Sequence, residues 1–278
     1  SRISRRINVE VLVFSLNRII SKIGGKDPIL WIYLPTWTVL QCVQRIPHQM
    51  LVYNCIDALS QNPAGVSLDY GRAEGNILRK ADLVITTSEM LYREKLPNNP
   101  RTHWVSHGVD SHWLEKIEPT SRFEMLDRPR IGFFGTIDHR LDLELLRRLA
   151  QAHKDWLFVL IGEVRCDIST LLLERNVKFL GSKPHSKLLP YLVNLDVFIL
   201  PYVLDSFTQY IQPVKLFECL ALGKPIVATR LPALEVFEEV VQLAFGFEEF
   251  DRALGEAICE TQPELQGKRR DIARANSW

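Results

Sequence analysis

A lysine and a glutamate lie three residues apart, at Lys215 and Glu218, in an apolar segment toward the end of the chain. The segment, residues 213–230, reads PVKLFECLALGKPIVATR. Pro213 suits the first turn of a helix, where its missing N–H has no partner to lose. Gly223 suits the position after the helix, where a left-handed backbone is common. The pattern therefore predicts a helix between these two residues, with Lys215 and Glu218 on one face.

Lys215 is electrostatically misplaced in the first turn of such a helix, since that end already carries partial positive charge. A docked anion would account for it, because helix N-termini bind phosphate through free N–H groups. Glu218, one turn further on, could accept hydrogen bonds from two neighbouring hydroxyls, as on a ribose. Phosphate and ribose together indicate a nucleotide site. The alternative is a surface Lys–Glu pair worth about 0.2–0.5 kcal/mol, and these residues alone leave both interpretations open.

Short apolar segments alternate with helical ones along the chain, which is typical of an α/β fold with parallel sheets. In the first half the predicted strands are Ile29–Leu34, Leu51–Cys55, Leu83–Thr87 and His103–Ser106. Ser88 is expected to cap the helix after its strand. The polar segment Glu115–Pro129 predicts a linker, and the alternation resumes at Arg130. Ligands of such sheets bind beyond the carboxyl ends of the strands.

The segment 213–230 resembles the donor-site signature of GT-B glycosyltransferases of the group 1, or family 4, kind. Other fragments are similar to that family in the same order: 81–88 (ADLVITTS), 105–110 (VSHGVD), 130–136 (RIGFFGT), 156–162 (WLFVLIG), 177–181 (VKFLG), 188–201 (LLPYLVNLDVFILP) and 275–278 (ANSW). The similarity covers nearly the whole chain and is greatest to bacterial enzymes of teichuronic acid and exopolysaccharide assembly.

This resemblance implies two Rossmann-like domains whose parallel sheets face each other across a cleft. Residues 1–118 would be a partial N-terminal acceptor domain, and residues 119–278 a C-terminal nucleotide-sugar donor domain. Compared with the family, the chain is expected to be a fragment that lacks the first strands, the glycine-rich acceptor loop and the terminal helix.

The resemblance also assigns roles around the predicted helix. In the family a glutamate at the position of Glu218 holds the donor ribose. The leaving diphosphate would be stabilised by fixed donors, namely the helix N-terminus after Gln212, together with Lys215 and Arg140. Gln212, Pro213 and Val214, at that terminus, are expected to line the substrate site. No metal is expected, because no Asp-x-Asp follows a predicted strand, and no cofactor is expected besides the donor substrate.

Two glycines end predicted strands of the donor domain, where a bare backbone can approach a phosphate. Gly135 and Thr136 follow the first strand, and Gly162 follows the second. We expect all three to contact the donor, although an ordinary strand–helix turn would also place a glycine there. The family usually carries an arginine directly after the first glycine. Thr136 replaces it here, and Arg140 is the nearby cation.

The loop Pro201–Gln212 is expected to hold the donor sugar and phosphates. The family motif has a second glutamate eight residues before Glu218, which normally contacts the transferred hexose. That position is Tyr210 here, so either the sugar is held differently or catalysis is weakened. The motif usually accompanies retention at the anomeric carbon, and Tyr210 leaves the stereochemistry open.

Three titratable residues in the first half of the chain are candidates on the acceptor side. Asp57 follows a predicted strand, and we expect it to assist the acceptor hydroxyl. His107 lies in a turn between the domains and could exchange a proton near neutral pH, although the family usually carries asparagine there. Glu74 resembles a recurring acid of the bacterial subset. A purely structural role stays open for each of them.

Composition sets further bounds. The 278 residues carry a net charge of +1, so the composition shows no nucleic-acid-binding footprint, and no nucleic-acid partner is expected. The five cysteines lack metal-ligand spacing, as expected for reduced thiols in the cytoplasm. The most apolar stretch, Val9–Ile20, contains Glu10, Asn17 and Arg18 and is too short to span a membrane. It could instead form a core helix or an amphipathic helix in peripheral contact with the inner face of a membrane.

The expected activity is sugar transfer from a nucleotide-diphosphate sugar to a glycan or lipid-linked acceptor, without a metal ion and with retention. The losses at Thr136 and Tyr210 keep a non-catalytic nucleotide-sugar-binding subunit open as an alternative. A sugar-nucleotide epimerase with the same fold is another. Base, sugar, acceptor and linkage are not readable from the sequence.

Overall fold

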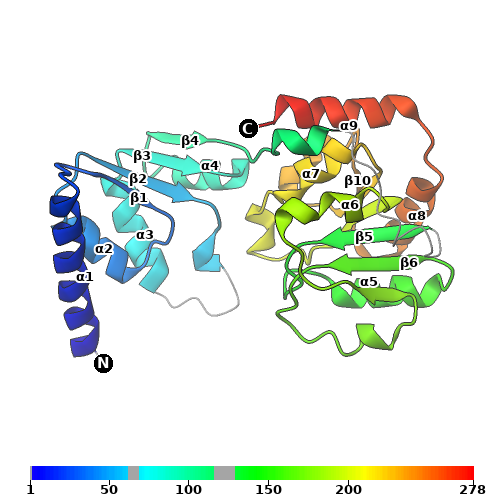
Figure 1. Ribbon diagram of the computed structural model, residues 1–278, viewed down its shortest axis with the longest axis horizontal. Coiled ribbons are helices and arrows are strands. Elements are labelled where there is room, and N and C mark those ends of the chain that lie inside the picture. Colours follow the sequence, from blue (N-terminus) through cyan, green and yellow to red (C-terminus); the bar gives the residue numbers. More distant parts are fainter. Residues whose placement is uncertain (1, 62–68, 116–128) are drawn as a thin grey trace. The chain divides into compact units, whose positions relative to one another are not determined.

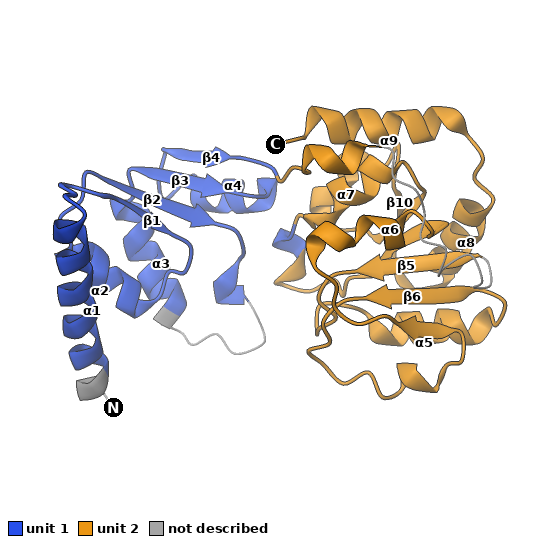
Figure 2. Ribbon diagram, in the orientation of Figure 1, with its two compact units in different colours: residues 1–106, 209–211 blue, residues 107–208, 212–278 orange. Residues whose placement is uncertain are grey.

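The computed structural model of the chain describes residues 2–61, 69–115 and 129–278. It divides into two compact units (Figure 2). The first unit comprises residues 1–106 and 209–211, and the second comprises residues 107–208 and 212–278. The predicted boundary between residues 118 and 119, and the linker around it, fall outside the described residues.

A four-stranded parallel sheet in the order β1-β2-β3-β4 forms the centre of the first unit (Figure 1). Its strands are β1 (Ile29–Ile32), β2 (Met50–Cys55), β3 (Leu83–Thr86) and β4 (Thr102–Trp104). Its helices are α1 (Arg2–Lys22), α2 (Trp37–Arg45), α3 (Asp69–Lys80) and α4 (Glu89–Lys95). The four strands predicted for this half of the chain are therefore confirmed to within two residues at each end.

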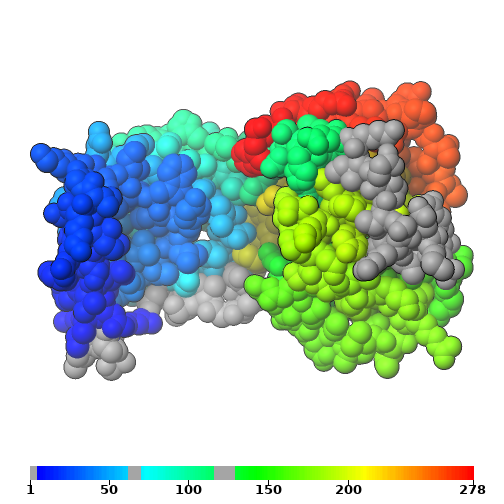
Figure 3. Space-filling view, in the orientation of Figure 1, coloured from blue at the N-terminus to red at the C-terminus, as the bar shows by residue number. Residues whose placement is uncertain are grey.

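Local signals in the sequence explain where the helices of this unit begin and how they pack. The Ser88 hydroxyl accepts a hydrogen bond from the Leu91 N–H at 3.3 Å, which confirms it as the cap of α4. In α1, Val9 and Val13 are buried in a small core that it shares with α2. Other apolar side chains of α1, including Ile7, Val11 and Phe14, are exposed. Figure 3 shows the helix in dark blue. No helix in the described part of the chain is long and apolar enough to span a membrane.

The second unit contains a six-stranded parallel sheet in the order β10-β9-β8-β5-β6-β7. Its strands are β5 (Arg130–Phe134), β6 (Leu157–Ile161), β7 (Val177–Phe179), β8 (Val197–Leu200), β9 (Ile226–Thr229) and β10 (Gln242–Ala244). Its α-helices are α5 (Leu143–Ala152), α6 (Leu189–Leu192), α7 (Lys215–Leu222), α8 (Gly246–Ile258) and α9 (Pro263–Ala275).

The order of these strands reverses between β5 and β8. The chain builds outward from β5 through β6 to β7, then returns to the other side of β5 and builds outward again through β8, β9 and β10. Right-handed crossovers in opposite directions place α5 and α7 on opposite faces of the sheet. Accordingly α5 packs with α8, and α7 packs with α9. Such a reversal is a topological switch point, where ligands of open α/β sheets bind beyond the carboxyl ends of the strands.

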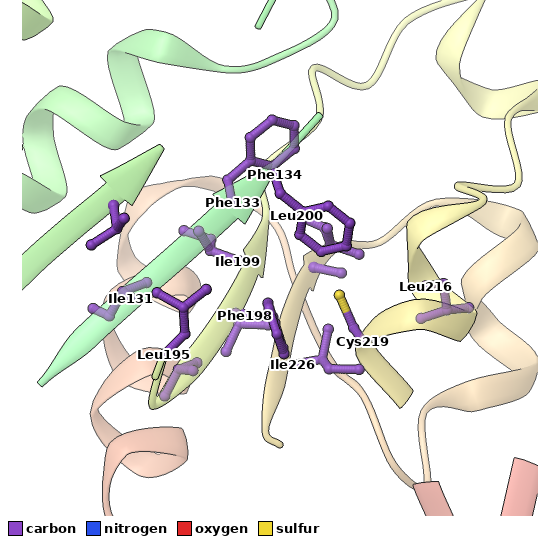
Figure 4. Packing of buried hydrophobic residues seen from close by; sticks show 14 of the residues in the cluster. Ile131, Phe133, Phe134, Leu195, Phe198, Ile199, Leu200, Leu216, Cys219 and Ile226 are labelled. Atoms are coloured by element: carbon purple, nitrogen blue, oxygen red, sulfur yellow. The ribbon is translucent and has the colours of Figure 1, made fainter. Parts of the chain in front are cut away.

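The core of the second unit holds this edge in place. All residues of β5, β6, β8 and β9 are buried, as expected for central strands covered on both faces. Figure 4 shows Ile131, Phe198 and Ile226 on three of these strands, with Leu216 and Cys219 of α7 nearby. Fixed strands and a fixed helix give the polar groups at the carboxyl edge a defined geometry.

Candidate functional site

Helix α7 begins close to where the sequence predicts, with one correction. Its first residue is Lys215, so Pro213 precedes the helix instead of occupying its first turn. The turn before the helix is tighter than α, because the Leu216 N–H bonds the Pro213 carbonyl at 3.0 Å. No side chain caps this end, which leaves first-turn N–H groups for a ligand. Gly223, at φ 70°, ends the helix as predicted.

The ammonium of Lys215 lies among aromatic groups at the switch point. Its Nζ atom donates to the hydroxyl of Tyr202 at 2.9 Å and lies 4.9 Å from the ring centre of Phe133. Phe133 belongs to β5, and Tyr202 follows β8 by two residues. No carboxylate lies within ion-pair distance of Lys215 in the part of the chain that the structure describes. Within that part of the chain, its positive charge is therefore not balanced by a neighbouring carboxylate.

Of the two predicted glycines, Gly135 lies against this lysine, and Gly162 packs against Gly135. A Cβ atom on Gly135 would lie 2.9 Å from the Lys215 Cε atom and 3.0 Å from its Nζ atom, and the φ of Gly135 is 117°. A Cβ atom on Gly162 would lie only 1.8 Å from the Gly135 carbonyl oxygen. Both positions thus require glycine, and together they leave the backbone after β5 and β6 bare below the ammonium.

Glu218, one turn further along α7, is paired with a residue that the sequence analysis did not identify. The His185 Nε2 atom lies 2.6 Å from the Glu218 Oε1 atom. A carboxylate only accepts hydrogen bonds, so Nε2 carries the proton. The His185 ring packs on Trp113, with 5.1 Å between ring centres. The side chain of Glu218 is only 11% exposed, whereas that of His185 is 57% exposed.

These contacts replace the surface pair that was the alternative interpretation. Lys215 bonds Tyr202 and Glu218 bonds His185, so the two charged residues of α7 point to different partners. Only one feature of the sequence could have indicated that His185 belongs to the site. It follows the loop after a predicted strand, at the carboxyl edge where ligands bind.

Arg140 has a carboxylate partner of its own. Its guanidinium forms a fork with Asp138, including contacts of 2.9 and 2.6 Å. Burial opposes ionisation of Asp138, but the hydrogen bonds and charge of Arg140 keep its pKa below the usual value. The guanidinium of Arg140 is thus paired with an acid two residues before it in the chain. Thr136 is half-buried in the same turn.

Tyr210 belongs to the first unit, although the loop that contains it leads into α7. Its carbonyl accepts a hydrogen bond from the Ser88 hydroxyl at 2.6 Å. Burial, reinforced by the charge and hydrogen bond of Glu94, raises the pKa of its phenol. In the second unit Gln212 and Pro213 are buried, and Val214 is 48% exposed.

Asp57 lies half-buried just beyond β2, where its carbonyl accepts the Leu59 N–H. In the second unit His107 is half-buried, and burial lowers its pKa, which favours the neutral imidazole. Glu74 is buried and forms a 3.0 Å ion pair with Lys95. Among the described residues, no group of three or more His, Cys, Asp and Glu side chains is placed to hold a metal ion.

The structure thus brings together Lys215, Gly135, Gly162 and the N-terminus of α7, with Glu218 one turn away. It adds Tyr202 and His185 to this group. It places Asp57 and Tyr210 in the other unit. The Lys215 ammonium, above the side-chain-free backbone of Gly135, is suited to bind an anion. The buried carboxylate of Glu218, one turn away, is suited to accept hydrogen bonds from hydroxyl groups.

Comparison with known sequences finds a family model that matches the second unit. Residues 128–261 match the family described as glycosyl transferases group 1. The chain is also 28% identical over 282 residues to TuaH of Bacillus subtilis (strain 168), whose name assigns it to teichuronic acid biosynthesis as a glycosyltransferase. The match covers 92% of this chain and 70% of TuaH.

Solved structures share the architecture. Sucrose-phosphate synthase from Thermosynechococcus elongatus matches with a TM-score of 0.78 at 19% identity, over 96% of this chain and 73% of the synthase. Anabaena HepE, solved in complex with UDP and glucose, matches with a TM-score of 0.68 at 20% identity, over 97% of this chain and 77% of HepE. The chain therefore has the GT-B fold, and residues 128–261 match the group 1 glycosyl transferase family.

Proposed function

We propose that this protein transfers a sugar from a nucleotide-diphosphate sugar to a glycan or lipid-linked acceptor. The observation that carries the proposal is the Lys215 ammonium, which lies over Gly135 at the switch point without a carboxylate partner among the described residues. A cation in this state is stabilised by an anionic ligand. The donor diphosphate is the anion that a group 1 glycosyltransferase domain would bind.

The donor would lie along the first turns of α7. Its diphosphate would rest over Gly135, between the Lys215 ammonium and the N–H groups at the start of the helix. Its ribose would bond Glu218, whose carboxylate can accept from two hydroxyls while His185 holds it in place. The HepE complex, which contains UDP and glucose, supports a nucleotide of this kind in the shared fold.

Charge explains how these groups would act in the reaction. Breaking the bond between sugar and diphosphate leaves negative charge on the nucleotide. Fixed donors, here Lys215 and the helix N-terminus, stabilise that charge without a metal ion. Arg140 would stabilise the leaving diphosphate less than the sequence predicts, because its charge is already neutralised by Asp138. We propose retention at the anomeric carbon and assign help to the acceptor hydroxyl to Asp57.

Titration calorimetry with UDP, GDP and dTDP, each beside its free nucleoside, tests the donor site. We expect one diphosphate to bind at least tenfold tighter than its nucleoside, since a charge-assisted contact is worth about 1.5–3 kcal/mol. Equal affinity for a diphosphate and its nucleoside would contradict the proposal. A transfer assay with the matching labelled sugar nucleotide then tests the activity.

A specific observation favours one second candidate, a non-catalytic nucleotide-sugar-binding subunit. Tyr210 stands where the family has a sugar-binding glutamate, and its backbone carbonyl is held by Ser88 in the first unit. Nucleotide binding without transfer to any glycan or lipid-linked acceptor would support the subunit. Release of an epimerised sugar nucleotide would instead point to an epimerase.

We further propose a cytoplasmic location with peripheral contact at the inner membrane face, through α1. Ile7, Val11 and Phe14 lie on one side of this helix and are 56%, 59% and 67% exposed. Arg6 and Arg18 on the same helix are also exposed, and would suit anionic lipid. Co-sedimentation with vesicles containing anionic lipid, but not with neutral vesicles, is the expected result. Loss of that binding in Phe14→Glu would assign it to α1.

A further inference from the structure

Tyr202 lies in the loop after β8, at the switch point, and several contacts fix its position there. It follows β8 by two residues, and its side chain is buried, with only 6% of the residue exposed. Its carbonyl accepts the hydroxyl of Thr229 at 2.7 Å, and a β-bridge joins it to Leu141. These contacts anchor the residue on both sides and fix the position of its phenol beside Lys215.

The direction of the hydrogen bond between these two residues follows from their chemistry. An ammonium can only donate, so the Tyr202 oxygen accepts the 2.9 Å bond from Lys215. The phenol proton must therefore point elsewhere. Within the described residues the Tyr202 hydroxyl has no partner other than Lys215. The hydroxyl of a residue that is only 6% exposed thus retains a proton with no acceptor among the described residues, and an unsatisfied donor is costly where it is shielded from water.

At the switch point, the Lys215 ammonium and the Tyr202 hydroxyl therefore both have hydrogen-bond donors that are not yet used. Lys215 has three N–H groups and uses one of them on Tyr202. Tyr202 has its O–H. Beneath them Gly135 contributes no side chain, and a Cβ there would crowd the Lys215 ammonium. What this arrangement lacks is an acceptor, and an anionic oxygen would satisfy the phenol and the ammonium together.

We propose that Tyr202 donates its phenol proton to the diphosphate of the donor, and acts with Lys215 as a paired anion-binding device. This inference rests on the proposed function, because it names a further residue of that same site. It also accounts for Thr136: where the family carries an arginine after the glycine, this chain supplies a neutral donor from the opposite side of the switch point. Because the diphosphate gains charge as the sugar leaves, the phenol bond strengthens during the reaction.

The variant Tyr202→Phe tests the proposal, because it keeps the ring against Lys215 and removes only the hydroxyl. UDP, GDP and dTDP, each with its nucleoside, are titrated into the wild-type protein and the variant. We expect affinity for the diphosphate to fall about tenfold, as for one charge-assisted hydrogen bond, and affinity for the nucleoside to stay unchanged. Tyr33→Phe, at a residue that is 50% exposed in the first unit, is the matched control and should change neither value.

Failure of this inference differs from failure of the proposed function. If the wild-type protein binds a diphosphate tighter than its nucleoside, and Tyr202→Phe does the same within twofold, Tyr202 has no part in binding and the inference is overturned. If the wild-type protein shows no preference for any diphosphate, both fall. Inorganic pyrophosphate provides a second readout: its own dissociation constant, measured by direct titration, should rise in Tyr202→Phe, and an unchanged constant would contradict the assignment. Thermal unfolding of the variant, compared with the wild type, checks that packing is intact.

Discussion

Each unit of this protein places a lysine close to its parallel sheet, and the two lysines have opposite surroundings. In the first unit, Lys95 has a 3% exposed side chain and two carboxylate partners, Glu74 at 3.0 Å and Glu94 at 2.8 Å. Burial alone would lower the pKa of Lys95, but these carboxylates raise it above the usual value. In the second unit, Lys215 has two aromatic side chains as neighbours, Tyr202, whose hydroxyl it bonds, and Phe133.

The difference separates a structural charge from one that awaits a ligand. Around Lys95 the network is closed, since the Tyr53 hydroxyl also donates to Glu74 at 2.7 Å. Closed buried networks hold a fold together and are costly to break. An uncompensated cation at the carboxyl edge of a sheet, over glycines that keep the backbone bare, contributes little to stability and is available for function.

The largest effect is expected at Lys95. Lys95→Met leaves Glu74 buried without its cation, so the free energy of unfolding should fall by about 3–5 kcal/mol, measured by urea denaturation. Arg93→Met, which removes an exposed ion pair from the same helix, should cost only about 0.3–0.5 kcal/mol. A loss at Lys95 as small as that control would show that the network is not structural.

The next largest loss of stability is expected at Gly162, whose missing side chain leaves room for the Gly135 backbone at the site. A Cβ there collides with the Gly135 carbonyl, so Gly162→Ala should cost about 1–3 kcal/mol of stability and displace the backbone beneath Lys215, weakening diphosphate binding. Gly255→Ala is the control, because a Cβ there meets nothing within 4 Å and alanine within helix α8 should stabilise by about 0.5–1 kcal/mol. If Gly162→Ala binds the diphosphate as tightly as the wild-type protein, the backbone at these glycines has no part in the binding site.

At Lys215 we expect loss of binding without loss of stability. Lys215→Met should weaken UDP or GDP binding by about 1.5–3 kcal/mol, as for a lost charge-assisted bond, and leave the free energy of unfolding within about 0.5 kcal/mol of wild type. Calorimetry and urea denaturation measure the two. Lys178→Met, at an exposed lysine on β7, controls for net charge. If Lys215→Met lowered the free energy of unfolding as much as Lys95→Met does, Lys215 would be a structural charge like Lys95, contrary to this account.

Glu218→Gln should weaken binding by about 1–3 kcal/mol, because the hydroxyls it holds lose a charged acceptor. The distinguishing readout is the ribose. Wild-type protein should prefer a nucleoside diphosphate over its 2′,3′-dideoxy form, and the variant should lose that preference. If the variant still discriminates between the two, the ribose lies elsewhere.

The smallest effect is expected at His185, which holds Glu218 in place. His185→Phe keeps a ring against Trp113 and removes the N–H donor, so UDP or GDP affinity should fall by about 0.5–1.5 kcal/mol. Tighter binding in this variant would mean that His185 competes with the donor for Glu218 instead of orienting it. His139→Phe, at an exposed histidine, serves as the control.

The sequence predicts those features that depend on neighbouring residues. Alternating apolar segments predict the parallel strands, and Ser88 and Gly223 mark the ends of helices where the structure has them. Lys215 and Glu218 share a helix, so their spacing was informative. The fork between Arg140 and Asp138 was equally local, and an acid two residues away could have indicated it.

Partners that are distant in sequence could not be predicted this way. His185 meets Glu218 across 33 residues and Tyr202 meets Lys215 across 13. Each pairing depends on how loops leave different strands at the carboxyl edge. Which side of β5 the chain returns to is set by packing of the whole sheet, and this choice places Tyr202 beside Lys215.

A crystal structure of the protein with UDP or GDP bound tests the central claim most directly. We expect the diphosphate above Gly135, within hydrogen-bond distance of the Lys215 ammonium and the Tyr202 hydroxyl, with the ribose hydroxyls on Glu218. A nucleotide bound elsewhere, with Lys215 still contacting Tyr202 alone, would contradict it.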